Sequence, residues 1–151
     1  MKKIRFIEGN KIDLKLKKVV KEFKEANVVP ALVYDILLHG TKTVIGECDA
    51  RLGMNMHLYY SGNIGFSVYE KYRGNSVAEE AVNLLKHVFK ANNVNRIIIA
   101  TNPGNHATQR VCEKLGAKFM EKAEIPEDND MRILRGETHK LIWYLELTPS
   151  V

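Results

Sequence analysis

The sequence YRGNSVA at residues 72–78 lies between a strand-like segment, NIGFSV at residues 63–68, and the most strongly amphipathic helix that the chain predicts. The apolar face of that helix comprises Ala78, Ala81, Val82, Leu85, Val88 and Phe89. The first turn of a helix has N–H groups without intrahelical partners and a partial positive charge, and small residues there let a phosphate approach the backbone. We therefore interpret residues 72–78 as a phosphate-binding helix start, to which Arg73 adds a fork of donors.

The same residues also fit a purely structural interpretation. Ser76-Val77-Ala78-Glu79 matches a capping box, in which the serine and the glutamate satisfy the free backbone donors of the helix without a ligand. Acidic residues in the first turn complement the helix dipole in the same way. The local pattern leaves both interpretations open.

Outward from this helix, periodicity predicts the remaining elements. Alternating residues predict an N-terminal hairpin around a turn at 8–10, and a second hairpin of strands 31–38 and 43–52. The other expected elements are a short helix at 19–27, strands at 59–68, 95–100, 117–125 and 139–147, a helix at 107–115 and a loop at 126–136. This order predicts an α/β (α+β mixed) fold. We expect a central mixed, mostly antiparallel sheet of about six to seven strands flanked by helices, in a single domain at residues 1–151.

Composition narrows the classes of function. The two cysteines, Cys48 and Cys112, lie far apart and have no ligand spacing, so we expect neither a disulfide framework nor a metal site. No run of about 18 apolar residues occurs, and no signal-type apolar region follows the basic N-terminus, so we expect a cytoplasmic protein without a membrane partner. The net charge of +5 favours anionic partners, either a nucleic acid or a phosphate-rich cofactor. The lysines are dispersed, however, and this fits a solvated surface equally well.

Residues 59–120 together resemble the GNAT superfamily of acyl-CoA N-acyltransferases. RGNSVA at 73–78 is similar to that family's Arg/Gln-x-x-Gly-x-Gly/Ala signature. NPGNHAT at 102–108 and CEKLGA at 112–117 resemble its Asn-x-x-Ser/Thr and Glu-Lys-Leu-Gly-Phe segments. The subgroup that the chain looks most like contains the ribosomal-protein N-terminal acetyltransferases. The resemblance implies acetyl-CoA as the cosubstrate.

The resemblance also implies individual roles. In the family, the fourth and fifth strands splay apart and hold the pantetheine arm between them, here against the backbone of residues 66–68. The diphosphate would lie at the amides of residues 74–78, and Asn105 would bond the pantetheine near its sulfur. The implied cofactor-binding residues are Phe66, Ser67, Val68, Arg73, Gly74, Asn75, Ser76, Val77, Ala78, Asn105 and Thr108.

The chain departs from the family pattern at two positions. Ser76 replaces the second glycine of the signature, and its Cβ would either crowd the diphosphate or bring a hydroxyl to it. Cys112 stands where many members carry a tyrosine that acts as an acid. A small buried hydrophobe is the competing interpretation of this cysteine.

Acyl transfer to an amine requires a neutral amine and therefore a proton acceptor. Glu47 is our preferred base over Asp49 and Glu70, and with Cys112 it completes the candidate catalytic set. A backbone amide near residues 67–68 would stabilise the oxyanion. The leaving thiolate, with a thiol pKa of about 8.5, needs only weak acid help.

The sequence is compatible with three functions. The first is an N-acetyltransferase that moves an acetyl group from acetyl-CoA to a primary amine by direct attack in a ternary complex. The second is a non-catalytic acyl-CoA-binding regulator, and the third is a small nucleic-acid-binding domain, which lacks the interleaved aromatic and basic strand of an RNA-binding sheet. The acceptor is either a small-molecule or a peptide amine. Pairing of an exposed terminal strand would allow a homodimer.

Overall fold

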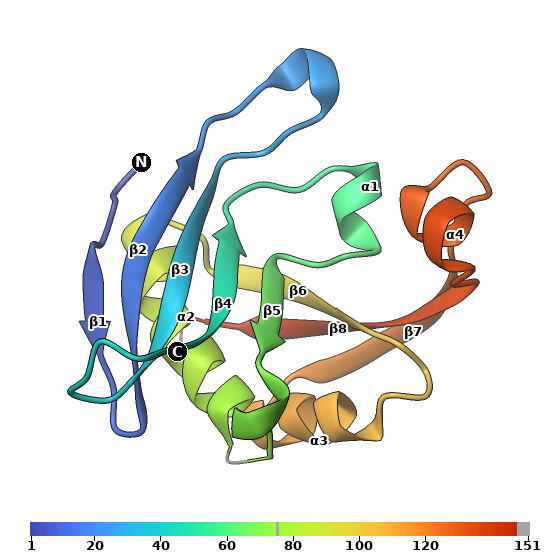
Figure 1. The fold of residues 1–151 in the computed structure, drawn as a ribbon. Helices are drawn as coiled ribbons and strands as arrows, with labels where there is room; N and C mark the ends of the chain where they lie inside the picture. The colour runs from blue at the N-terminus through green and yellow to red at the C-terminus, as the bar shows by residue number, and fades with distance from the viewer. Residues whose placement is uncertain (75, 148–151) are drawn as a thin grey trace.

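Two antiparallel sheets form the frame of the protein, whose computed structural model describes residues 1–74 and 76–147 (Figure 1). The first sheet has the order β1-β2-β3-β4-β5 and the second has the order β6-β8-β7. The strands are β1 (Phe6–Glu8), β2 (Ile12–Val20), β3 (Ala31–Leu38), β4 (Val44–Arg51), β5 (Ile64–Val68), β6 (Arg96–Thr101), β7 (Lys118–Glu124) and β8 (His139–Glu146). The helices are α1 (Met56–Tyr59), α2 (Val77–Ala91), α3 (His106–Leu115) and α4 (Asp130–Arg135), with short 3-10 turns at Lys24–Ala26 and Glu70–Tyr72.

This architecture confirms the predicted α+β class with antiparallel strands flanked by helices. It differs in the number of strands, because eight strands form two sheets where about six to seven were expected in one. The division falls between β5 and β6. Asn63 donates its backbone N–H to the carbonyl of Ile98 at 2.8 Å, and no ladder joins the two strands beyond that point in the described residues.

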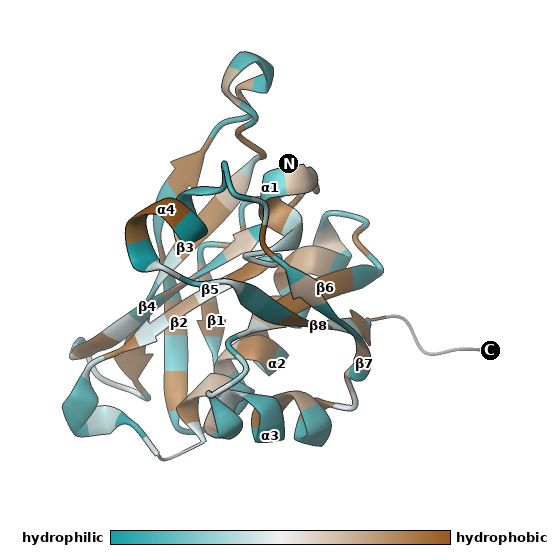
Figure 2. Cartoon of the chain, turned by 90° about the vertical axis from the view of Figure 1, so that its right-hand side faces the viewer, coloured by the Kyte–Doolittle hydropathy of each residue, from teal (hydrophilic) through white to brown (hydrophobic). Residues whose placement is uncertain are grey.

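Helix α2 packs on one face of the first sheet and supplies much of the core. Its residues Ala81, Leu85 and Phe89 have no exposed surface, as the apolar stripe predicts for residues three and four apart. The same buried cluster contains Ile36 of β3 and Ile97 of β6. Figure 2 shows hydrophobic colour on α2 and on the strands that face it, and hydrophilic colour along α3. One core therefore extends beneath both sheets.

A carboxylate fastens the first turn of α2 to the N-terminal hairpin. Glu80 accepts hydrogen bonds from the backbone N–H groups of Asn10, Lys11 and Ile12 at 3.0, 3.0 and 2.8 Å. Hydrogen bonds to a charged acceptor are stronger than those between neutral groups. They hold the start of α2 in a defined position relative to the sheet.

Asp13, a second carboxylate, joins the two hairpin turns and is itself buried. It accepts hydrogen bonds from the N–H groups of Gly9 at 3.0 Å and Gly40 at 2.9 Å, and its Oδ1 lies 2.9 Å from Nδ1 of His39. Burial by itself would raise the pKa of Asp13, but these hydrogen bonds outweigh burial and lower it. The hydrogen bond to Asp13 raises the pKa of His39.

The helix predicted at residues 19–27 is wrong. Val19 and Val20 continue β2 and pair with Leu32 and Ala31 of β3. Both valines are β-branched and fit a pleated sheet better than a helix. Pairing with β3 therefore decided a segment whose own apolar spacing was ambiguous.

The loop predicted at residues 126–136 contains helix α4. Asn129 caps its start by accepting a hydrogen bond from the N–H of Met131 at 2.9 Å, and Gly136 ends it with a left-handed φ of 68°. Caps at both ends stabilise a helix that is too short to show a hydrophobic period.

The strand expected from residue 59 begins later, at Ile64 of β5. Residues 56–59 instead form α1, because Asn55 accepts a hydrogen bond from the N–H of Leu58 at 2.8 Å and caps a helical turn. Gly62 then turns the chain with a φ of 81°. A side chain at this position would approach the backbone of β6, so the tight turn requires glycine.

The terminal strand β8 lies between β6 and β7, so both of its edges are already paired. The terminal strand therefore has no free edge of the kind that the sequence analysis considered for pairing with a second copy, and a homodimer stays a prediction. Within residues 1–74 and 76–147, no helix is both long enough and apolar enough to span a membrane.

Candidate functional site

The turn from β5 into α2 has an unusual backbone. Gly74 and Ser76 both have left-handed conformations, with φ of 87° and 60°. Ser76 occupies the N-cap position of α2, but its side chain makes no capping hydrogen bond. The capping box that the sequence allowed is therefore absent at Ser76. Ser76 therefore leaves the first N–H groups of α2 without its hydroxyl as an acceptor.

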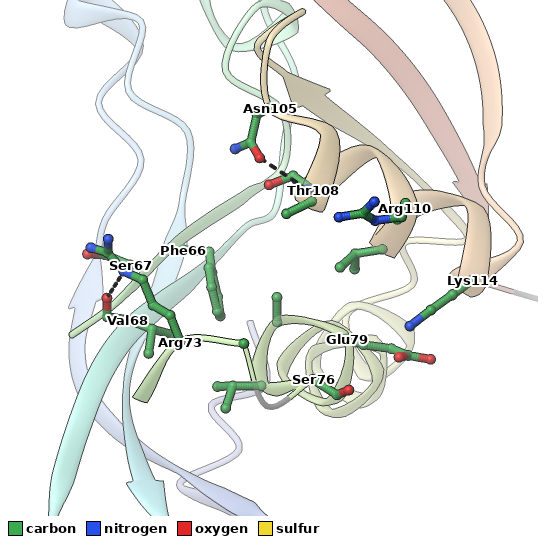
Figure 3. A pocket seen from close by; sticks show the side chains of 15 residues that line it. Phe66, Ser67, Val68, Arg73, Ser76, Glu79, Asn105, Thr108, Arg110 and Lys114 are labelled. Atoms are coloured by element: carbon green, nitrogen blue, oxygen red, sulfur yellow. Dashed lines mark hydrogen bonds between the residues drawn. The ribbon is translucent and has the colours of Figure 1, made fainter. Parts of the chain in front are cut away.

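A cleft of about 630 Å³ opens beside this turn. One wall is β5, the floor is the start of α2, and the other wall is α3 (Figure 3). Its lining residues are Phe66, Ser67, Val68, Arg73, Gly74, Ser76, Val77, Ala78, Glu79, Asn105, Ala107, Thr108, Arg110, Val111 and Lys114. Ten of the eleven residues predicted to bind the cofactor are among them, and the eleventh, Asn75, lies outside the described residues. Their binding of a cofactor stays a prediction.

The cleft lies where the two sheets separate. Phe66 of β5 faces it, and the edge of β5 that points toward β6 carries no ladder in the described residues. Asn63 holds the other end of this opening closed, because its side-chain Oδ1 accepts the N–H of Ile98 at 2.8 Å. The splay between the family's fourth and fifth strands thus corresponds here to β5 and β6.

Arg73 is held at the carboxyl end of β5. Its Nε donates a hydrogen bond to the carbonyl oxygen of Val68 at 2.9 Å, as Figure 3 shows. One nitrogen of the guanidinium is therefore used to orient the side chain, and the remaining N–H groups are available to an anion. Arg73 lies at the rim of the cleft.

Asn105 has a structural task as well as a place in the cleft. Its Oδ1 caps α3 by accepting the N–H of Thr108 at 3.1 Å. The amide nitrogen of Asn105 points away from that bond in Figure 3. One side chain can therefore cap the helix with its oxygen and donate to a ligand with its nitrogen.

Three charged residues of the cleft were missed by the sequence analysis: Glu79, Arg110 and Lys114. Arg110 and Lys114 lie on α3, four residues apart and therefore on one face. The signal was present, because residues 107, 110, 111 and 114 follow a helical spacing from Asn105. Figure 3 shows Lys114 and Glu79 pointing toward one another across the mouth of the cleft.

The two candidate catalytic residues do not line this cleft. Glu47 lies on β4, opposite Ser67 of β5, with its Oε2 2.6 Å from Nζ of Lys17. Cys112 is buried in the core, and burial raises the pKa of its thiol to about 12. This placement is what the interpretation of Cys112 as a small buried hydrophobe expects. A catalytic role for either residue stays a prediction.

The other titratable groups considered as bases lie elsewhere. Asp49 forms an ion pair with Arg51, with its Oδ2 2.8 Å from Nε, and Glu70 lies in the exposed turn after β5. Within residues 1–74 and 76–147, no group of three histidine, cysteine or acidic side chains is placed to hold a metal ion. The cleft therefore offers backbone N–H groups, two cations on α3 and one arginine at its rim. This donor set suits a polyanion.

A known family model matches most of the chain. The family model of the acetyltransferase (GNAT) domain matches residues 5–118. A search of curated protein sequences found no match.

Solved structures resemble most of the chain or nearly all of it. The ribosomal-protein-S5-alanine acetyltransferase of Vibrio fischeri has a TM-score of 0.66 at 15% identity, over 95% of this chain and 99% of that one. A GNAT-family acetyltransferase of Bacillus anthracis has a TM-score of 0.58 at 22% identity, over 76% and 66%. A microcin C7 self-immunity acetyltransferase, solved with acetyl-CoA and AMP, has a TM-score of 0.55 at 17% identity, over 77% and 61%. At these identities the likeness shows a shared fold.

Proposed function

Because the chain belongs to the family of GNAT acetyltransferase domains, we propose that it transfers an acetyl group from acetyl-CoA to a primary amine, by direct attack in a ternary complex. The observation that carries the proposal is the cleft between β5, α2 and α3, with its uncapped helix start. We also propose that residues 1–151 form one domain, since residues of both sheets share one buried cluster.

The donors in the cleft fit the charge of acetyl-CoA. The N–H groups of Val77 and Ala78 at the start of α2 would hold the diphosphate, with Arg73 at the rim. Arg110 and Lys114 on the opposite wall would meet the remaining phosphate charge.

The pantetheine arm would extend along the free edge of β5. There the backbone of Phe66, Ser67 and Val68 would pair with it as an added strand. Asn105 would donate its amide to the arm from the opposite wall. The thioester would then lie on the unpaired edge of β5, toward the beginning of the strand.

The reaction itself needs few groups. The amine nitrogen attacks the thioester carbonyl, the C–N bond forms, the C–S bond breaks, and a backbone N–H at the unpaired edge of β5 stabilises the oxyanion. The amine gives its proton to a base or to water, and the thiolate takes one from solvent. Because the pKa of Cys112 is raised to about 12 by burial, the thiol of this residue is a poor acid for the leaving group.

A non-catalytic acyl-CoA-binding regulator is the second candidate. The buried position of Cys112 favours it, since no acid occupies the place of the family's tyrosine. Release of free CoA thiol in the presence of amines separates the two functions. A regulator would bind acetyl-CoA without releasing thiol.

Two matched variants test the site. Asn and Asp both tolerate a left-handed backbone, so Ser76→Asn and Ser76→Asp should fold alike. The added carboxylate of Ser76→Asp lies at the helix start and should weaken acetyl-CoA binding about tenfold or more in calorimetry. Ser76→Asn should stay within about threefold of the parent chain. Equal affinities of the two variants for acetyl-CoA would show that the diphosphate does not bind at this turn.

A further inference from the structure

A second cavity of about 310 Å³ lies beside the end of β4, between β3 and α1. Cys48 and Phe66 pair across these strands on the face that α2 covers, whereas Asp49 and Gly65 pair on the opposite face. Asp49 lines the second cavity, and Phe66 lines the cofactor cleft. The second cavity is therefore lined by β4, and the cofactor cleft by β5, its neighbour in the sheet.

The second cavity combines an aliphatic surface with one pair of opposite charges. Val28, Val29 and Leu58 contribute apolar surface, and Asp49 and Arg51 contribute the pair. The side chains of Asp49 and Arg51 are 20% and 26% exposed, so bulk water screens their charges less than it would on an open surface.

The ion pair is held in a fixed orientation. Arg51 donates through Nε to Asp49 Oδ2 at 2.8 Å, and through Nη1 to the carbonyl of Gly62 at 3.1 Å. The other ends of the two groups, Asp49 Oδ1 and Arg51 Nη2, lie over Gly65, where a Cβ would overlap both. A carboxylate oxygen and a guanidinium nitrogen are thus presented side by side at the beginning of β5.

The beginning of β5 is a suitable position for the acceptor amine to contact the thioester. A strand rises about 3.3 Å per residue, so Gly65 lies about 10 Å along β5 from Val68. An extended arm that starts near the turn into α2 would bring its reactive end to this part of the strand. The edge of β5 is not paired with β6 there, in the part of the chain that the structure describes.

Resting on the proposed function, we propose that the second cavity binds the acceptor and that this acceptor is a small zwitterion, an aliphatic amino acid. Asp49 Oδ1 holds the amino group, Arg51 Nη2 holds the carboxylate, and the valines and Leu58 contact the side chain. A polyamine would bring a cation against Arg51, and a simple amine would offer no carboxylate to Arg51 Nη2.

The transfer is balanced without another reactant. The ammonium group of the zwitterion loses one proton to water, and its nitrogen then forms a bond to the thioester carbon. The same nitrogen loses a second proton to water as the tetrahedral intermediate collapses. The C–S bond breaks, and the thiolate takes a proton from solvent. The products are an N-acetyl amino acid and CoA.

The test compares leucine with isopentylamine, which has the same side chain and amine but lacks the carboxylate. Thiol release should give a kcat/KM for leucine about tenfold or more above that for isopentylamine, the value expected for one charged hydrogen bond. Arg51→Gln should remove this preference for leucine, so that the ratio of the two kcat/KM values falls about tenfold or more. Asp49→Asn should lower the rate with both acceptors.

Arg51 also holds Gly62, so loss of the arginine could disturb the loop. A disturbed loop would lower the rates with both acceptors equally. The ratio of the two rates therefore separates a loss of carboxylate recognition from a disturbance of the fold. Arg96→Gln, which breaks an exposed ion pair with Glu146 between β6 and β8, is the matched control and should keep the parent ratio.

Three results would overturn the inference: equal rates with leucine and isopentylamine, an equal fall of both rates in Arg51→Gln, or acetylation of a leucyl peptide or spermidine with leucine inert. Each of these leaves the proposed acetyltransferase function standing. If calorimetry shows no binding of acetyl-CoA, the proposed function itself fails, whatever the acceptor.

Discussion

We expect Glu79→Gln to tighten the binding of acetyl-CoA and Lys114→Gln to weaken it. Both side chains line the cleft, and Figure 3 shows them pointing toward one another across its mouth. Acetyl-CoA carries several negative charges on its phosphates, so a carboxylate in the cleft repels it and an ammonium group attracts it. The two substitutions remove one charge each and should therefore act in opposite directions.

The magnitude follows from the exposure of the two residues. For a phosphate about 8 Å away, Coulomb's law gives roughly 0.5 kcal/mol per unit charge in water and roughly 2 kcal/mol at the effective dielectric of a protein surface. Lys114 is exposed and Glu79 is half-buried, so values near the lower end apply. We expect Kd to change about two- to fivefold in each direction.

Isothermal titration with acetyl-CoA at about 20 mM and about 1 M salt measures the effect, since the Debye length falls to about 3 Å at the higher salt. Both changes should vanish there. Glu146→Gln removes the same charge from β8, outside the cleft, and controls for the net charge of the chain. Shifts of the same sign for Glu79→Gln and Lys114→Gln, or equal effects of Glu79→Gln and Glu146→Gln, would refute the placement of the phosphates.

Further predictions concern the cap, the buried thiol and pH. Asn105→Ala removes the cap to Thr108 and should lower Tm by about 2–4 °C. Asn105→Ser keeps the cap, yet both variants should lower turnover about tenfold if the amide contacts the cofactor; full turnover in both would end that role. Cys112→Ala should retain kcat within about twofold, because burial raises the thiol pKa to about 12; a large fall in kcat would restore a catalytic role. The hydrogen bond to Asp13 raises the pKa of His39, so its stabilisation is full below the unfolded pKa of about 6.5 and is lost as pH rises through the folded value. Urea unfolding should therefore show a larger cost of His39→Gln near pH 6 than near pH 9, and a cost independent of pH would contradict the interaction.

Most elements of the fold follow from local sequence. The strand predicted at 31–38 has the bounds of β3, and the apolar stripe after residue 76 predicts α2, because burial of one face imposes a period on the sequence. Residues 19–27 and 126–136 were mispredicted for a different reason. One segment takes its structure from its partner strand and the other from its two caps, and neither influence produces a period.

The candidate site likewise has parts that local sequence predicts and parts that only the tertiary structure decides. The sequence by itself predicted the candidate phosphate-binding turn and the candidate contribution of β5, because these lie within residues 66–78 and depend on local geometry. The tertiary structure alone decided that Lys114 faces Glu79 and that Asp49 and Arg51 meet over Gly65. Strand register and helix packing bring these side chains together, and the periods of single elements do not encode either one.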